Sequence, residues 1–388
     1  MMNILYLACQ DPRKTEVGGQ QRTFLLWNAL QKHGNVYTIV PVFGRLDPAD
    51  KIYFWDLNAS EFRGQLKYGL KEYLNFLLWW KTGLAIKPLY SFPDVKKIFP
   101  GIKFDMVVCR HFKVLDYFNP YDIAPTFIDL DDYPLTLFKT VITQQKKYNF
   151  IFSFIWGNLL RLELWWHSLQ WAGAWVSNRE DLGKTGTKNR TMLLNNIPLN
   201  VYDGGTAPLD RNILFMIGGA FYYPNVDGLN NFLTTVWPII HKKHPNLRFF
   251  IVGRGWEGLF EEKWKCLPNV ECTGFVSNLG ELYAKCLATV VPIDSGAGTC
   301  IKTLESLSNG RICFATPFGA RGLSLTKSEL SDIGVMVYEK PDDFLSTLEK
   351  ILALPEWRKE REKSARMFIR ENYSRASFDL QVSSLLNR

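Results

Sequence analysis

The feature that most limits how this chain can fold is a repeated order of short apolar runs, glycine turns and helical segments. The first apolar run, 4–8, leads through Gly18 and Gly19 into a helix predicted at 20–32 and a second strand at 36–42. A strand, a crossover helix and a following strand form a right-handed unit with parallel strands. Further strands of the same sheet are predicted at 104–109, 125–130, 174–177 and 192–194.

The same order starts again in the second half of the chain. A strand at 213–217, a helix at 227–242 and a strand at 247–252 open it. Later strands are predicted at 270–273, 287–292, 312–315 and 335–337. A chain of 388 residues exceeds the ~250–300 that one core usually supports. We therefore expect an N-terminal α/β domain at 1–200, a second at 201–373 and a terminal helix within 374–388, with the polar stretch 200–210 as linker.

Composition excludes several classes of protein. With 47% hydrophobic and 22% charged residues, the chain is not disordered. Its seven cysteines form no metal-binding spacing and are expected to be reduced thiols, as in the cytoplasm. The longest apolar run, 150–160, is too short to cross a bilayer, which needs ~20 residues. Nothing at the N-terminus resembles a signal peptide, so we expect a cytoplasmic protein.

The segment 295–305 carries the clearest chemical signal. It lies between a predicted strand and a predicted helix, and its glycines let backbone amides approach a ligand. A helix N-terminus favours an anion. Lys302 and Glu305 share one helical face, where an ammonium suits a phosphate and a carboxylate suits ribose hydroxyls. The alternative is an ordinary glycine turn with a surface Lys–Glu pair.

Two more glycine turns follow strands of the same predicted sheet. Gly218 and Gly219 follow one strand, and the turn 253–255, with Arg254 at its centre, follows another. Ligands of open α/β sheets gather at the carboxyl ends of the strands. Together with Lys302 these turns predict a diphosphate site. None matches a dinucleotide or Walker fingerprint, so neither NAD nor ATP is indicated.

These turns belong to a longer pattern that resembles the donor domain of GT-B glycosyltransferases of family 4. The resemblance rests on the segments 213–228, 250–255, 270–276 and 298–305 with Gly310 after them, and the order matches over about 210–325. Gly18, Gly19 and Arg22 match the family's N-terminal glycine loop. The rest of the N-terminal half matches only loosely.

The resemblance implies a GT-B fold, in which two Rossmann-like domains with parallel sheets face each other across a cleft. The C-terminal domain would bind a nucleotide sugar and the N-terminal domain the acceptor, and the terminal helix would pack back on the N-terminal domain. Transfer would retain the anomeric configuration without an essential metal or any cofactor besides the donor. The donor-binding residues would be Gly218, Gly219, Arg254, Val276, Gly298, Thr299, Lys302 and Glu305.

Two departures from the family pattern concern charge. The first of the family's paired glutamates would fall on Ala297, so only Glu305 remains. The usual Arg and Lys after the first donor strand are replaced by the stretch 220–225, as in a subgroup that carries a Lys at the place of Lys302. The diphosphate charge is therefore expected to rest on Lys302, Arg254 and backbone amides.

The acceptor side is predicted from polar residues that end strands of the first sheet. Asp129 is interpreted as orienting an acceptor hydroxyl, since it lies where many members of the family place a histidine facing the cleft. Alternatives are a DxD metal clamp, which belongs to the GT-A fold, and an acidic turn that caps the next segment. The other acceptor-side candidates are Gly18, Gly19, Arg22, Arg110, His111 and Asp131.

Two stretches rich in aromatic and basic residues, 67–90 and 139–175, leave two interpretations open. Tryptophan beside lysine suits an anionic membrane surface, which a lipid-linked acceptor would explain. Residues 1–200 carry 24 basic and 17 acidic side chains, a net +7. The alternative is that these stretches form core helices filled by aromatic rings. No RNA-stacking motif is present, so nucleic acid is not an expected partner.

Taken together, the sequence predicts a hexosyltransferase-type glycosyltransferase acting on a glycan or lipid-linked saccharide, as in polysaccharide biosynthesis, in the cytoplasm or at the cytoplasmic face of the membrane. Lys302, Glu305, Arg254 and Asp129 are the predicted catalytic residues, and no metal site is predicted. The alternatives are a nucleotide-sugar epimerase or hydrolase on the same fold, and a non-catalytic subunit that binds nucleotide sugar.

Overall fold

The structure is a computed structural model that describes residues 2–44, 46, 51–59, 93–142, 150–184, 191–199, 201 and 211–386. It divides into two compact units. Unit 1 takes Met1–Leu135, Phe150–Leu194 and Asp379–Arg388, and unit 2 takes Thr136–Asn149 and Asn195–Phe378. The aromatic stretch predicted at 67–90 and most of the predicted linker lie outside the described residues.

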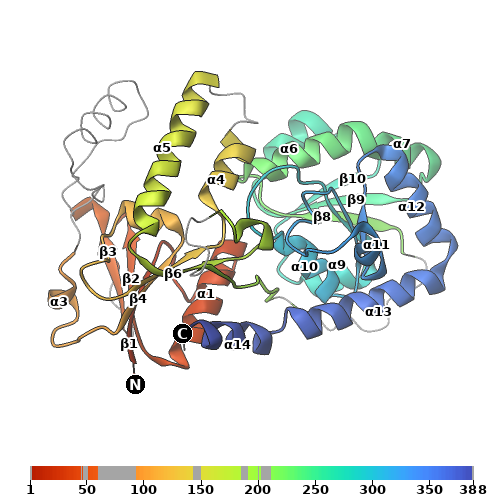
Figure 1. The fold of residues 1–388 in the computed structure, drawn as a ribbon. Coiled ribbons are helices and arrows are strands. Elements are labelled where there is room, and N and C mark those ends of the chain that lie inside the picture. The colour runs from red at the N-terminus through yellow and green to blue at the C-terminus, as the bar shows by residue number, and fades with distance from the viewer. Residues whose placement is uncertain are drawn as a thin grey trace. The chain divides into compact units, whose positions relative to one another are not determined.

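Unit 1 is built on a sheet of parallel strands in the order β3-β2-β1-β4-β5-β6-β7 (Figure 1). The strands are β1 (Met2–Ala8), β2 (Gly34–Val42), β3 (Ile52–Asp56), β4 (Met106–Arg110), β5 (Thr126–Leu130), β6 (Trp171–Val176) and β7 (Thr191–Leu193). Its central strands are apolar on both faces, as a sheet covered on both sides requires. Sequence patterns predicted all of these strands except β3, which lies at the edge.

The helices of unit 1 follow the glycine turn and the later strands. They are α1 (Gly18–Gln31), α3 (Val95–Ile98), α5 (Phe150–Ser168) and, for its larger part, α14 (Arg375–Leu386). The short helix α4 (Pro134–Leu137) is divided between unit 1 and unit 2. Helix α14 is joined to α1 by an ion pair between Lys32 and Asp379, and Ser383 Oγ lies 3.1 Å from His33 Nε2. The C-terminal end of the chain is thus part of unit 1, beside its first helix.

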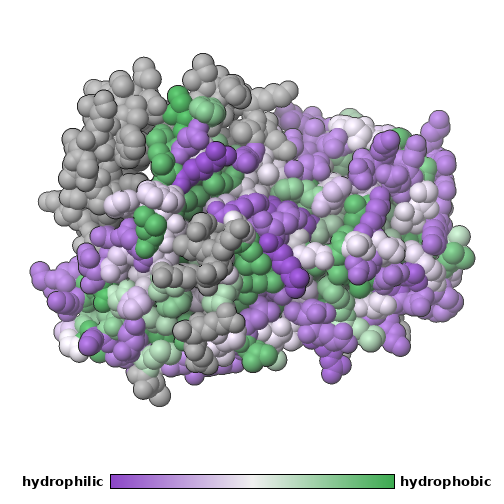
Figure 2. Space-filling view, viewed as in Figure 1, coloured by the Kyte–Doolittle hydropathy of each residue, from purple (hydrophilic) through white to green (hydrophobic). Residues whose placement is uncertain are grey.

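Helix α5 has an apolar face on each side. Leu164 and His167 are buried towards the core, whereas Phe154 is 63% exposed and Trp165 56%. Leu162, Trp166 and Leu169 are exposed as well. Figure 2 shows hydrophobic residues at the molecular surface over this helix. The interpretation as a core helix therefore holds for one face of α5, and membrane contact by the exposed face stays a prediction. No helix in the described ranges is long and apolar enough to span a bilayer.

Unit 2 is built on a second parallel sheet, in the order β10-β9-β8-β11-β12-β13. The strands are β8 (Ile213–Ile217), β9 (Arg248–Val252), β10 (Val270–Gly274), β11 (Cys286–Val291), β12 (Ile312–Ala315) and β13 (Val335–Val337). The helices are α6 (Tyr223–Asn231), α7 (Trp237–Lys243), α8 (Glu257–Leu259), α9 (Leu279–Lys285), α10 (Ile301–Ser308), α11 (Lys327–Asp332), α12 (Pro341–Ala353) and α13 (Pro355–Asn372).

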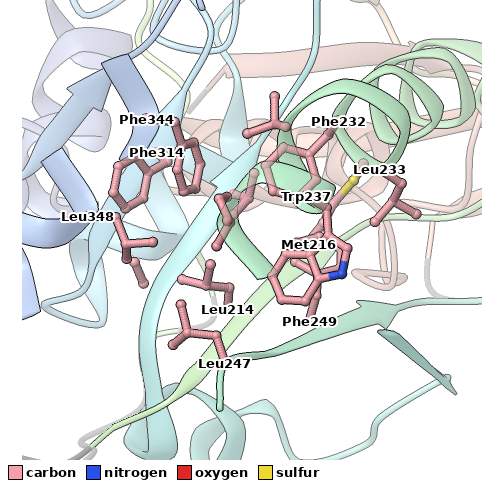
Figure 3. Close-up of a cluster of buried hydrophobic side chains, with 14 of the residues drawn as sticks. Leu214, Met216, Phe232, Leu233, Trp237, Leu247, Phe249, Phe314, Phe344 and Leu348 are labelled. Carbon is pink, nitrogen blue, oxygen red and sulfur yellow. The ribbon is translucent and has the colours of Figure 1, made fainter. Parts of the chain in front are cut away.

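The core of unit 2 is packed by large aromatic side chains between the sheet and its helices (Figure 3). Phe314 of β12 and Phe344 of α12 stack with ring centroids 3.9 Å apart. Trp237 is fully buried against Phe249 and donates its indole N–H to the Pro268 carbonyl oxygen at 3.0 Å. Rings of this size contribute much of the apolar area that holds the strand ends in place.

Candidate functional site

The carboxyl ends of the parallel strands in unit 2 meet at one edge, where the backbone is unusually close-packed. The Gly218 amide donates to the Val252 carbonyl oxygen at 2.9 Å. Gly253 has φ +136°, and a Cβ atom placed on it would lie 2.1 Å from the Gly218 carbonyl oxygen. Only glycine fits such a contact. The two glycine turns predicted from sequence are therefore in direct contact.

The turn after β11 leads into α10 with its first amides uncapped. Gly298 has φ +66°, and Thr299 after it is buried. The N-cap residue of α10, Cys300, makes no side-chain hydrogen bond to the first helical turn. A helix N-terminus whose amides point away from the helix without a side-chain partner suits an anionic ligand.

Lys302 and Glu305 lie on α10 as the sequence predicts. The Lys302 side chain reaches the first glycine turn, since a Cβ atom on Gly218 would lie 2.9 Å from Lys302 Cε. Within the described part of the chain no carboxylate pairs with the Lys302 ammonium, and the side chain is half-buried. Glu305 is 7% exposed. The structure therefore brings Lys302, Gly218 and the start of α10 together.

Arg254 takes a different position from Lys302. Its guanidinium carbon lies 4.4 Å from the centroid of the Phe275 ring, which is 60% exposed. Its carbonyl oxygen accepts a hydrogen bond from the Ala220 amide. Val276 is partly buried against the small apolar cluster that contains Phe215 and Tyr283. Arg254 thus lies in the turn after β9, and its side chain reaches the turn after β10.

Sequence reasoning missed three residues around this edge. Asn225 Nδ2 donates to the Gly219 carbonyl oxygen at 2.8 Å, and Trp256 Nε1 to the Gly218 carbonyl oxygen at 2.6 Å. Thr140, which is part of unit 2, donates through Oγ1 to the Gly296 carbonyl oxygen and accepts from the Gly296 amide at 3.0 Å. Sequence analysis considered the stretch 220–225 only for the basic residues that it lacks, so the hydrogen-bonding amide of Asn225 was overlooked.

In unit 1 the predicted acceptor-side residues form a buried ionic network at the carboxyl edge of the first sheet. Arg22 donates to both carboxylate oxygens of Asp129, at 2.9 and 2.6 Å, and to the Leu194 carbonyl oxygen. Arg110 pairs with Asp131 at 3.1 Å and donates to the Gly19 carbonyl oxygen at 3.4 Å. The fold therefore brings several of the acceptor-side candidates into contact, and their role in binding an acceptor stays a prediction.

Asp129 differs in detail from its predicted role. It is fully buried, and the guanidinium of Arg22 occupies both carboxylate oxygens. In this conformation it orders the strand ends, so a direct contact with an acceptor stays a prediction. Pairing with Arg22 and Arg110 also neutralises Asp129 and Asp131, which argues against the alternative of a metal clamp.

His111 follows β4 with a backbone conformation that is rare for a residue with a side chain, φ +77°. Its Nδ1 accepts a hydrogen bond from the Lys113 amide, so the proton of the neutral ring is on Nε2. Burial and then the neighbouring Arg110 charge lower the pKa of His111 from 6.5 to about 4. The ring is therefore uncharged at neutral pH.

We expect NMR titration of the histidine ring protons, with His111→Gln to identify the resonance, to give a pKa for His111 near 4. Because this pKa is lower in the folded than in the unfolded chain, acid protonates the unfolded chain first. His111 then lowers the stability of the fold as pH falls from 6.5 towards 4, and has no such effect above that range. A pKa at or above 6.5 would contradict the burial of this ring.

Comparison with known proteins finds a family model that matches the part of the chain in which the second sheet and its glycine turns lie. A family model described as "Glycosyl transferases group 1" matches residues 211–353. A Klebsiella pneumoniae protein, described as an uncharacterized 44.6 kDa protein in the cps region, is 26% identical over 125 residues. That match covers 30% of this chain and 32% of the relative, so it spans about a third of the relative's length.

Solved structures resemble the chain over its whole length. Sucrose-phosphate synthase from Thermosynechococcus elongatus has a TM-score of 0.68 at 15% identity, covering 100% of this chain and 98% of that one. HepE from Anabaena, crystallised with UDP and glucose, has a TM-score of 0.61 at 11% identity, covering 100% of both chains. The glycosyltransferase WaaG has 0.58 at 13%, covering 98% of both. At such identities the likeness shows the fold, and the prediction of a two-unit GT-B architecture is confirmed.

Proposed function

We propose that the protein moves a hexose from a nucleoside-diphosphate donor to a hydroxyl of a glycan or lipid-linked saccharide. The proposal takes as its premise that residues 211–353 belong to the group 1 glycosyl transferases. The observation that carries the proposal is the convergence of Lys302 on the Gly218 turn beside the uncapped start of α10. One unpaired ammonium and a set of backbone amides suit a diphosphate.

The proposed chemistry is electrostatic. Lys302 and the amides near Thr299 would stabilise the negative charge that develops on the diphosphate as the bond to the sugar breaks. Glu305 would accept hydrogen bonds from the ribose, and Arg254 with Val276 would lie near the base. These groups supply the positive charge without a metal ion, and retention of the anomeric configuration is part of the proposal.

On the acceptor side, we propose that unit 1 holds the hydroxyl to be glycosylated. The neutral ring of His111, which carries its proton on Nε2, can donate one hydrogen bond, and Arg110 adds a donor beside Asp131. Gly18, Gly19 and Arg22 shape the backbone around them. HepE, one of the similar structures, contains UDP and glucose, so UDP-sugars are the first donors to test.

The test is donor binding followed by turnover. Thermal-shift screening with UDP-, GDP- and dTDP-sugars is expected to find one nucleotide that stabilises the fold. Turnover is then measured with and without a saccharide acceptor. Nucleotide release that depends on acceptor supports transfer. Product formed without acceptor favours an epimerase or hydrolase, and binding without any turnover favours a non-catalytic subunit.

We further propose that the exposed face of α5 contacts the anionic cytoplasmic face of a membrane, where a lipid-linked acceptor would be found. Phe154, Leu162 and Trp165 recur at helical spacing on that face, with Arg161 exposed beside them. Leu169, directly after the helix, is exposed as well. Indole rings favour the interface between headgroups and acyl chains. The excess of +7 in residues 1–200 complements anionic lipid.

Cosedimentation with vesicles containing phosphatidylglycerol checks this surface. The parent chain is expected to sediment with anionic vesicles, and Trp165→Ser with Leu169→Ser to lose at least about half of that binding, because apolar area and basic charge act together. Leu354→Ser with Met367→Ser, which changes two exposed apolar residues of unit 2, is the matched control and should bind as the parent does. Equal binding by the α5 variant would exclude this face.

A further inference from the structure

The first turn of α6 carries a buried side chain whose hydrogen-bonding capacity is only partly used. Asn225 is 3% exposed, and its Nδ2 donates to the Gly219 carbonyl oxygen. Its Oδ1 is buried and has no hydrogen-bond partner among the described residues. A buried acceptor without a donor is unfavourable, and such exceptions call for a physical explanation.

The orientation of this amide is set by the glycine turn. The Gly219 carbonyl oxygen can only accept a hydrogen bond, so the NH₂ end of Asn225 must face it and Oδ1 must face away. The same turn is held from the other side, because Trp256 Nε1 donates to the Gly218 carbonyl oxygen. The unpaired oxygen of Asn225 is therefore fixed in direction by a rigid backbone.

The Lys302 side chain lies next to this amide. A Cβ atom built on Gly218 would lie 2.7 Å from Asn225 Nδ2 and 2.9 Å from Lys302 Cε. The side chains of Asn225 and Lys302 therefore both lie close to Gly218, which has no side chain to separate them. Lys302 has three N–H donors and no carboxylate partner in the described ranges, and Asn225 has one free acceptor.

We infer that Asn225 is the positioning residue for Lys302: a rotation of the lysine side chain brings its ammonium to the unpartnered Oδ1, which then accepts one hydrogen bond and leaves the other two donors for the diphosphate. The inference rests on the proposed function and deepens it. The stretch 220–225 contains no Lys or Arg, so Lys302 is the ammonium that this turn can offer to the diphosphate. Once formed, the hydrogen bond to Asn225 fixes that ammonium against the diphosphate.

A double-mutant cycle on ligand binding by the full chain tests this. The probe is whichever of UDP, GDP and dTDP binds the parent most tightly in titration calorimetry, and the matching nucleoside, which lacks phosphate, is the second probe. We expect N225A to weaken diphosphate binding about tenfold, as loss of a charge-assisted hydrogen bond does. Binding of the nucleoside should not change.

The cycle separates positioning from a general structural role. On the K302A background, N225A should weaken diphosphate binding by less than about twofold, since Asn225 acts through Lys302. The exposed Asn230 on the same helix supplies the control, and N230A should bind as the parent does. Thermal melting checks that each variant is folded, and N225S replaces N225A in the cycle if the latter is not.

Two results overturn the inference while the proposed function stands. One is an unchanged diphosphate affinity in folded N225A, or in N225S where that variant replaces it, and the other is an equal loss with and without Lys302. A parent chain that binds none of the three nucleoside diphosphates defeats the proposed function and the inference with it.

Discussion

Replacing Lys302 with alanine is expected to lower kcat/KM for the nucleotide-sugar donor at least ~100-fold, a loss of about 2.7 kcal/mol of transition-state stabilisation. The side chain reaches the Gly218 turn, and no carboxylate in the described residues competes for its charge. The ammonium can therefore act on the leaving diphosphate, where negative charge grows as the sugar departs. Steady-state kinetics with varied donor measure the effect.

A matched control distinguishes this role from a general loss of positive charge. Lys263 is exposed in the same unit, and Lys263→Ala is expected to leave kcat/KM unchanged. The effect of Lys302→Ala should appear in kcat as well as in KM, because the charge it stabilises is larger in the transition state than in the bound donor. A Lys302→Ala enzyme with kinetics like the parent would remove Lys302 from the site.

The second large effect concerns stability. Asp129→Ala is expected to lower the free energy of unfolding of unit 1 by about 3–5 kcal/mol, because it leaves the buried guanidinium of Arg22 without its carboxylate. Arg22 is 1% exposed and Asp129 is fully buried, so water cannot replace the lost partner. Urea denaturation followed by circular dichroism measures the loss.

Two further sets of substitutions test whether burial of the Arg22–Asp129 pair causes this loss of stability. The exposed pair between Arg248 and Glu271 should contribute little, so Glu271→Ala is expected to unfold close to the parent. Replacing Arg22 with Met and Asp129 with Leu together should recover much of the lost stability, since apolar groups of similar size often replace a buried pair. An Asp129→Ala variant as stable as the parent would show that the pair does not hold the strand ends.

Periodicity and glycine turns predicted most of the fold. Apolar runs marked both parallel sheets, because strands covered on both faces contain few polar residues. Strand β3 was missed, since Ile52–Asp56 is a short edge strand in which a buried run is not complete. The helix predicted to begin at residue 227 begins at Tyr223, because Pro224 fits the first turn of a helix, where no backbone N–H is needed.

Only those parts of the candidate site that depend on residues close together in the sequence could be predicted. The spacing of Lys302 and Glu305 on one helix is a local property, and so is the glycine turn. The partner of Asp129 is Arg22, far away in the sequence, and no local pattern links them. Asn225 was missed for a related reason: its amide matters only because the fold places Lys302 over Gly218.

The central claim is that the carboxyl edge of the second sheet holds the diphosphate of a nucleotide sugar. The most direct measurement is a crystal structure of the full chain with a bound nucleotide sugar or the nucleoside diphosphate. We predict phosphate oxygens within hydrogen-bond distance of Lys302 Nζ and of the backbone amides near Thr299. A nucleotide bound at any other place on the chain, with Lys302 directed away from its phosphates, would contradict the account.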